Sequence, residues 1–323
     1  MSFRLFIYYC ALCGAWAALF VWLLVTLTGL AGEASDKWVI IRHSTMIGAV
    51  LGLFLAAVVG LLDALLNSVG FQRVLRPLVA MTVGLIGGMF GAFIGEALHR
   101  FTKLPKFPGW VLAGTAIGIS IGIFDVGRAV LAGSGFGMAA RKVLNGAIGG
   151  FLGGLVGGVV FDLLTAEAFV NLLASRSVRE EGGELITEVT EGIVLTRSSL
   201  AVGLVILGAC IGLLIGAAQV ILKEAWVRVE AGFRAGREMM LSKAETTVGR
   251  AESCDIGLFG DSAIERLHAR IVQRNNRYFL DDADTPGGTY LNGQRISGPT
   301  PLRSGDRIGI GRAVLRFGER AKR

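Results

Sequence analysis

The residues that could support catalysis or hold a metal are few and scattered along the chain. Three histidines occur, at His43, His99 and His268. None of them has a second metal ligand at coordinating spacing, and no glycine-rich loop ends in Gly-Lys-Ser or Gly-Lys-Thr to cradle a phosphate. An acidic run at residues 281–284 has the spacing of a calcium loop, but Gly293 stands where the closing glutamate should be. The sequence therefore predicts no enzyme, no metal site and no cofactor.

The side chains with the most recognisable spacing lie in the last third of the chain, residues 224–323. Short apolar runs of about five residues alternate there with clusters of Gly, Asp, Asn and Pro, a pattern typical of an all-β sandwich. Asn292-Gly293 separates two strand-like runs, which is the strongest short-range signal for a two-residue hairpin turn. We expect a separate β domain over residues 224–323.

Several short motifs follow one another along this domain in a fixed order. They are Gly249-Arg250, the CDIGL run from Cys254, Arg266-Leu267-His268-Ala269, the GGTYLNG run from Gly287, and Gly305-Asp306-Arg307-Ile308. In this order and spacing they resemble a forkhead-associated (FHA) domain, a β-sandwich that reads phosphothreonine. The resemblance covers roughly the last third of the chain.

The resemblance implies roles for individual residues. Arg250 matches the arginine that holds the phosphate in the family, because a guanidinium binds an oxyanion through two parallel hydrogen bonds. The positions that would line the peptide site are Arg250, Glu265, Arg266, Gly287, Gly288, Thr289 and Asn292. Gly249, His268 and Gly293 match family positions with structural roles.

The chain departs from the family at two of these positions. Glu265 stands where the family has a serine, and Pro286-Gly287 stands where the family has Thr-Asn. A carboxylate repels an incoming phosphate. Two interpretations follow: Arg250 and Arg266 bind a phosphothreonine peptide weakly or in a shifted pose, or Glu265 pairs with Arg250 and the loops dock a partner without phosphate. A third interpretation is a domain that only packs.

Residues 1–223 have the composition of a membrane domain. Hydrophobic residues make up 53% of the whole chain and charged residues only 18%, and the uncharged run from Leu5 to Leu30 is long enough to cross a bilayer of about 30 Å. Further apolar runs give six expected spans, at about 5–30, 44–66, 77–98, 109–127, 143–164 and 199–222. The expected fold is an α-helical transmembrane bundle followed by the all-β sandwich.

The second to fifth spans contain an internal duplication. A shift of 62 residues aligns Gly52 with Gly114, Asp63 with Asp125, and six further glycines of the first helical hairpin with glycines of the second. Glycines at four-residue spacing let helix backbones approach closely where lipid provides little hydrophobic drive for association. We expect glycine-zipper surfaces and a tight bundle, within one chain or in a homo-oligomer.

Four acids lie within or at the ends of the expected spans: Asp63, Glu96, Asp125 and Asp162. Because each is near the end of its helix, we expect interfacial anchoring, with Arg73, Arg100 or Arg128 in reach. A proton or cation path lined by Asp63 and Asp125 is the alternative, because intramembrane acids mark such paths.

Localisation and partners follow from the charge pattern and from the resemblance. The formal net charge is +7, but the basic residues of the sandwich are interleaved with acids, which indicates a solvated surface and no nucleic-acid partner. Arg228, Arg234 and Arg237, just after the last span, favour cytoplasmic termini. The sequence predicts a multi-pass cell-membrane protein that contacts membrane lipid and presents its FHA-like domain to a cytosolic, threonine-phosphorylated or unphosphorylated protein. The alternative function is a transporter or channel regulated by that domain.

Overall fold

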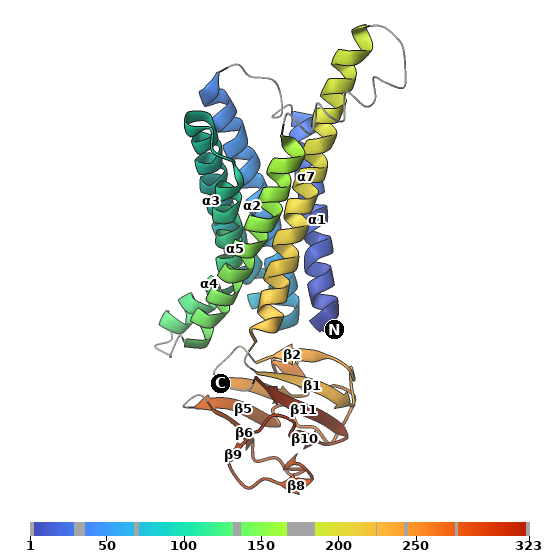
Figure 1. Cartoon of the computed structure of the whole chain (residues 1–323). Helices are drawn as coiled ribbons and strands as arrows, with labels where there is room; N and C mark the ends of the chain where they lie inside the picture. The colour runs from blue at the N-terminus through green and yellow to red at the C-terminus, as the bar shows by residue number, and fades with distance from the viewer. Residues whose placement is uncertain are drawn as a thin grey trace.

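The computed structural model describes residues 3–28, 36–67, 71–131, 137–166, 185–223, 225–241, 245–274 and 277–320. Long helices come first in the chain and a β-sandwich follows (Figure 1). The described helices are α1 (Phe3–Thr28), α2 (Lys37–Asn67), α3 (Gln72–Thr102), α4 (Phe107–Leu131), α5 (Gly137–Thr165) and α7 (Leu185–Ile221). Between the fifth and sixth expected spans, residues 185–198 belong to α7 and residues 167–184 lie outside the described residues.

These six helices are long and apolar enough to cross a membrane. Their spanning segments are 23 to 31 residues long, against about 20 residues for a hydrocarbon core of about 30 Å. Large apolar side chains also point outwards, among them Trp16 and Phe90, which are 63% and 56% exposed. A helix that is apolar on all sides suits a lipid environment better than water.

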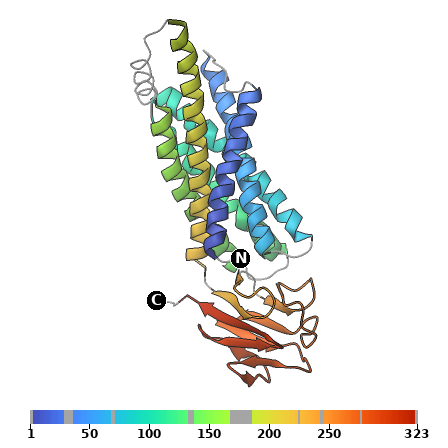
Figure 2. The same ribbon diagram turned by 90° about the vertical axis from the view of Figure 1, so that its right-hand side faces the viewer.

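The helices neighbour one another around the bundle in the order α1, α2, α3, α4, α5, α7 and back to α1. Figures 1 and 2 show them running side by side as one bundle, with α7 extending furthest from the sandwich. Close approach between neighbours occurs at glycines: a methyl group on Gly52 of α2 would overlap the carbonyl oxygen of Gly84 on α3, and one on Gly118 of α4 would overlap that of Gly146 on α5. The glycines of these hairpins therefore lie at helix contacts.

The register of these contacts differs between the two helical hairpins. Gly88 of α3 lies against the carbonyl oxygen of Gly48, whereas Gly150 of α5, 62 residues later, lies against that of Gly114. Gly114 corresponds to Gly52 under the same shift, so the second hairpin is offset by four residues, about one helical turn. The 62-residue duplication remains a prediction from the sequence.

The sandwich consists of two sheets. Its strands are β1 (Ala225–Ala231), β2 (Glu238–Met240), β3 (Glu245–Gly249), β4 (Ile256–Gly257), β5 (Ala269–Arg274), β6 (Arg277–Asp282), β7 (Thr289–Leu291), β8 (Gln294–Arg295), β9 (Thr300–Pro301), β10 (Arg307–Ile310) and β11 (Ala313–Glu319). One sheet has the order β2-β1-β11-β10-β7-β8 and the other β4-β3-β5-β6-β9.

Alternating side chains of both sheets form the core of the sandwich. On β1, Val227 and Val229 are buried while Arg228 between them is exposed, as expected for a strand with one wet face. The largest fully buried side chains of the sandwich include Tyr278 and Phe317, whose rings lie 5.5 Å apart. Asn292-Gly293 forms the β7–β8 turn, with φ angles of 51° and 86°, so the hairpin prediction is confirmed.

The sandwich lies against one end of the bundle. Its edge strand β2 faces the helices and β8 is farthest from them (Figure 1). The backbone N–H of Phe3 donates to Glu238 on β2 at 3.0 Å, and the Lys223 ammonium lies 3.4 Å from the Phe3 ring centroid and 4.3 Å from that of Trp226. The start of α1, the end of α7 and the sandwich are thus in direct contact.

Candidate functional site

Arg250 lies where β3 ends, on a loop held to the β4–β5 loop by backbone hydrogen bonds. Its N–H donates to the carbonyl oxygen of Glu265 at 2.9 Å, and the N–H of Ala251 donates to that of Arg266 at 3.0 Å. A methyl group on the preceding Gly249 would overlap the Arg266 carbonyl oxygen, which explains why only glycine fits there. The Arg250 side chain is exposed.

His268 links this loop pair to the β6–β7 loop and is fully buried. Its Nδ1 accepts a hydrogen bond from the Glu265 N–H at 3.1 Å, so the ring proton must be on Nε2. Nε2 lies 3.2 Å from the carbonyl oxygen of Gly288 and 3.2 Å from the Thr285 hydroxyl. The ring therefore acts as a neutral structural bridge between two loops.

Asp282, at the end of β6, fixes the shape of the β6–β7 loop. Its carboxylate accepts hydrogen bonds from the hydroxyls of Thr285 and Thr289, at 3.0 Å and 2.5 Å, and from the Thr285 N–H at 2.9 Å. Burial alone would raise the pKa of Asp282, but these donated hydrogen bonds outweigh it, and the pKa is lower than usual. Thr289 is itself fully buried, so its hydroxyl serves this loop.

Arg295 is part of the site although the sequence reasoning did not identify it. Its guanidinium donates to the carbonyl oxygens of Thr285 and Pro286, at 3.3 Å and 3.4 Å, and covers Gly288, whose φ is +66°. The β7–β8 hairpin brings Arg295 to the β6–β7 loop, because it pairs Arg295 with Tyr290, one residue after Thr289. Counting the register back from the Asn-Gly turn would have found it.

Asn292 is held away from the other candidate residues. Its side chain donates to Asp306 at 2.9 Å and accepts from the N–H of Arg307, also at 2.9 Å. These partners stand at the start of β10, whereas Thr289 is opposite Ile310 at the end of β10. Asn292 therefore orders the turn at the opposite end of β7 from Gly288.

The charges at the loop end are mainly positive. Arg250, Arg266 and Arg295 are exposed, Gly287 is exposed beside the His268 ring, and Glu265 is half-buried. Within the part of the chain that the structure describes, no ion pair joins Glu265 to Arg250, and only their backbones are bonded. The internal pair expected in one interpretation is not formed, so the Arg250 guanidinium is open to an external anion.

The comparisons with known proteins concern this domain. The FHA domain family matches residues 246–311, which include Arg250, Glu265, His268 and the β6–β7 loop. The C-terminal domain is an FHA domain. FhaB of Mycobacterium tuberculosis is 27% identical over 124 residues, which are 38% of this chain and 74% of FhaB.

Two further proteins are similar to the FHA domain. The glycogen accumulation regulator GarA of M. tuberculosis is 33% identical over 94 residues, which are 29% of this chain and 57% of GarA. The solved FHA domain of the CT664 protein from Chlamydia trachomatis is 24% identical, with a TM-score of 0.29, over 31% of this chain and all of that one.

The four acids that the sequence analysis named, Asp63, Glu96, Asp125 and Asp162, lie at the two opposite ends of the bundle. Asp63 of α2 and Asp125 of α4 share two cations, Arg76 of α3 and Lys142 of α5, at the end beside the FHA domain. The Lys142 ammonium is 2.7 Å from Asp63 and 3.2 Å from Asp125, and the Arg76 guanidinium is 3.5 Å and 2.5 Å from them. Arg76, Lys142 and Asp63 are at most 7% exposed, so Asp63 is buried among the helices.

At the other end, Glu96 of α3 pairs with Arg100 as expected, at 2.9 Å, and also with Lys106 at 2.9 Å. Asp162 of α5 accepts a hydrogen bond from the Phe107 N–H at 2.8 Å. Across the described ranges, no group of three or more His, Cys, Asp or Glu side chains could hold a metal ion.

Proposed function

We propose that this chain is a membrane-anchored adaptor whose FHA domain docks a threonine-phosphorylated cytosolic protein. One observation carries the proposal: Arg250 is exposed on a loop fixed through Glu265, His268 and Gly288, and its guanidinium is not neutralised by Glu265. A rigid, uncompensated guanidinium is the group that best recognises a phosphate dianion. The proposed docking to phosphothreonine is the activity of the FHA family, which this domain matches.

The departures from the family pattern predict a particular binding mode. Glu265 adds a half-buried carboxylate close to Arg250, and Gly287 offers no side-chain amide. Arg266 and Arg295, both exposed at the same loop end, would supply cationic donors in place of the missing neutral ones. We therefore propose binding that depends on phosphate but is weaker than the family pattern would give. Docking without phosphate is the alternative that the experiment below separates.

The test uses full-length protein in lipid nanodiscs and a phosphothreonine peptide library with its unphosphorylated counterpart. Binding should require phosphate, and Arg250→Ala should weaken it by at least tenfold, because a hydrogen bond to a charged group contributes about 1.5–3 kcal/mol. Arg277→Ala is the matched control, since this exposed arginine starts β6, at the end of the strand opposite the β6–β7 loop. Its affinity should equal that of the wild type.

Glu265→Ser separates the two docking modes. It restores a hydroxyl and removes the repelling charge, so phosphopeptide affinity should rise in an adaptor that binds phosphate. If phosphorylated and unphosphorylated peptides bind equally to the wild type, and Arg250→Ala changes neither, phosphate recognition is refuted and docking without phosphate takes its place.

We propose an anchoring role for the helices in preference to transport. Asp63 and Asp125, the acids that a cation path would use, are each bound to Arg76 and Lys142. Two carboxylates matched by two cations give a neutral cluster that holds α2, α3, α4 and α5 together. Such a cluster supports a static anchor, because a conducting acid has to exchange its partner.

A further inference from the structure

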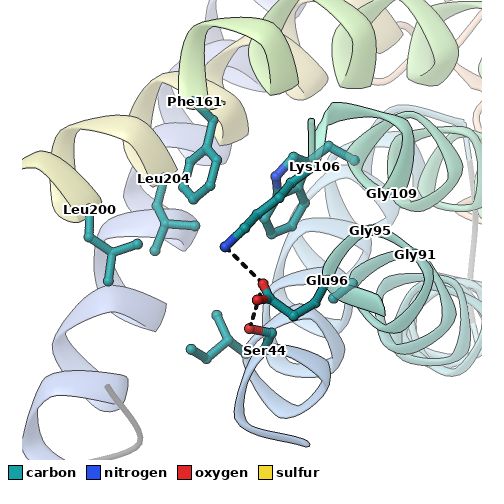
Figure 3. Close-up of a pocket in the computed structure, with 12 residues that line it drawn as sticks. Ser44, Gly91, Gly95, Glu96, Lys106, Gly109, Phe161, Leu200 and Leu204 are labelled. Atoms are coloured by element: carbon teal, nitrogen blue, oxygen red, sulfur yellow. Dashed lines mark hydrogen bonds and ion pairs between the residues drawn. The ribbon is translucent and has the colours of Figure 1, made fainter. Parts of the chain in front are cut away.

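A cavity of about 100 Å³ lies among the helices at the end of the bundle away from the FHA domain. Residues of α2, α3, α4, α5 and α7 line it. Phe161, Leu200 and Leu204 form an apolar wall, and Figure 3 shows them facing Lys106 and Glu96 across the cavity. None of these residues belongs to the FHA domain, so the cavity is a second candidate site in a different part of the molecule.

The carboxylate beneath the cavity is already saturated. Glu96 is 3% exposed and is bound by Arg100 and Lys106, each at 2.9 Å, and by the Ser44 hydroxyl at 3.1 Å. It therefore has little capacity to bind a cationic ligand. Lys106 remains about one-third exposed and carries further N–H donors that can turn towards the cavity.

Trp110 lines the same cavity and carries an unused hydrogen-bond donor. The side chain is 9% exposed, packs edge-on against Phe161 with ring centroids 5.1 Å apart, and lines the cavity. Its indole Nε1 is buried and finds no hydrogen-bond partner within the described ranges. A buried donor without a partner is destabilising, so the site favours a ligand that brings an acceptor oxygen.

A wider hollow of about 820 Å³ adjoins the cavity and shares Lys106, Phe161 and Leu200 with it. Four basic residues line the hollow: His99, Arg100, Lys103 and Lys106. The acid that also lines it, Asp162, already accepts the Phe107 N–H. The hollow is therefore lined by basic residues, whereas the adjoining cavity is lined mostly by apolar ones.

We propose that this site binds an amphipathic anion, with an apolar chain against Phe161, Leu200 and Leu204 and an acidic headgroup at Lys103 and Lys106. An oxygen of the ligand accepts the Trp110 Nε1–H. An anionic membrane lipid and a free long-chain acid share this chemistry. The basic residues of the hollow disfavour a cationic amphiphile. The apolar wall of the cavity favours a ligand with an apolar chain over a small inorganic anion.

The experiment is native mass spectrometry of the full-length protein, titrated separately with dioleoyl phosphatidylglycerol, dioleoyl phosphatidylcholine and oleate. Phosphatidylglycerol should bind at least tenfold more tightly than phosphatidylcholine, which has the same chains but no net charge. Oleate binding as tightly as phosphatidylglycerol assigns the site to free acids, and weaker oleate binding assigns it to an anionic lipid. Equal affinity for the two phospholipids overturns the proposal.

Matched variants locate the binding. Leu200→Trp places a bulkier side chain where the two spaces adjoin and should abolish the preference for the anion. Leu213→Trp, at an outward-facing leucine of the same helix that is 41% exposed, should retain it. Trp110→Phe removes the donor while it keeps an aromatic ring beside Phe161, and should weaken binding by roughly tenfold. Trp38→Phe, at a tryptophan that is 63% exposed, is its control.

Lys103→Asn keeps the test decisive if Leu200→Trp does not fold. Lys103 is exposed and has a φ of +61°, which asparagine tolerates, so this variant should fold and should lose part of the preference for the anion. If Trp110→Phe and Lys103→Asn both bind phosphatidylglycerol as the wild type does, the ligand lies elsewhere and the proposal fails.

Discussion

His268 is the residue on which the geometry of the loops around Arg250 depends. Its two ring nitrogens bond Glu265 on one loop and Gly288 on another, and the ring itself is fully buried. Without the ring, the Glu265 N–H and the Gly288 carbonyl group both lose their buried partner. The loop that carries Arg250 is therefore held in place, through Glu265, by a buried residue.

We predict that His268→Ala lowers the free energy of unfolding of the FHA domain by about 2–4 kcal/mol, because it leaves buried polar groups unpaired and opens a cavity. Hydrogen exchange of the β3–β4 and β6–β7 loops in the full chain should rise with it. His99→Ala, at a half-buried histidine of α3, is the control and should leave this exchange unchanged. Unchanged loop exchange in His268→Ala would refute the bridging role.

Asp282 predicts an acid sensitivity of the same loop. Its pKa is lowered in the folded domain, so its carboxylate stabilises the fold above the unfolded pKa of about 3.9. That contribution is lost as the pH falls through the lower, folded pKa. The free energy of unfolding in urea, monitored by hydrogen exchange of β5 and β6, should differ between wild type and Asp282→Asn at pH 7. This difference should narrow below about pH 4. A difference in the free energy of unfolding that stays constant down to pH 2 would contradict this prediction.

At the level of helices and strands, glycine contacts decide which helices can be neighbours. Gly118 and Gly127 lie on the same helix, α4, yet a methyl group would overlap the Gly146 carbonyl oxygen at the first position and meet nothing within 4 Å at the second. Substitution by alanine changes helix propensity equally at the two positions, whereas its packing consequences differ.

We predict opposite effects of alanine at these two positions. Gly127→Ala should stabilise the solubilised protein by up to about 1 kcal/mol, the propensity difference between the two residues. Gly118→Ala should lower the melting temperature, because α4 and α5 must move apart. The thermal unfolding of both variants in one detergent measures the effect, and equal shifts would show that this contact does not hold the helices together.

The cluster of Asp63, Arg76, Asp125 and Lys142 is the polar counterpart of the glycine contacts. Lys142→Met leaves one buried carboxylate, Asp63, and one half-buried carboxylate, Asp125, on a single guanidinium and should cost about 3–5 kcal/mol. Adding Asp125→Asn restores the balance of one cation and one carboxylate, so the double variant should recover part of the loss. Thermal unfolding of the single and double variants provides the measurement, and additive losses would show that the residues are not coupled.

For the whole molecule, the arrangement of the two ends of the bundle fixes the topology. The start of α1 and the end of α7 both contact the sandwich, through Phe3 with Glu238 and through the Ile221 carbonyl oxygen with Arg320 at 3.4 Å. If the helices span a bilayer, both termini are therefore on the side of the FHA domain. Three residues of sequence, 222–224, separate the end of α7 at Ile221 from the start of β1 at Ala225.

We predict that fusion reporters will place both termini in the cytosol. They should place an insertion between Thr165 and Leu185 on the opposite side of the membrane. A fluorescent protein that matures only in the cytosol should be bright after Arg323, and alkaline phosphatase, active only outside it, should be active when inserted between α5 and α7. The same phosphatase fused at the C-terminus is the control and should be inactive. Activity there would reverse the orientation and remove access to a cytosolic phosphoprotein.

The sequence alone determined the two-part architecture, the strand pattern of the FHA domain and the place of Arg250 at the end of a strand. Hydrophobic period, turn residues and motif order are local properties of the chain. Only the tertiary structure decided that Arg295 joins the loop, that Asn292 lies apart from it, and that Arg76 and Lys142 bind Asp63 and Asp125. Those facts depend on strand register and on the rotation of packed helices. Both are set by contacts between residues distant in the chain, which the local pattern does not encode.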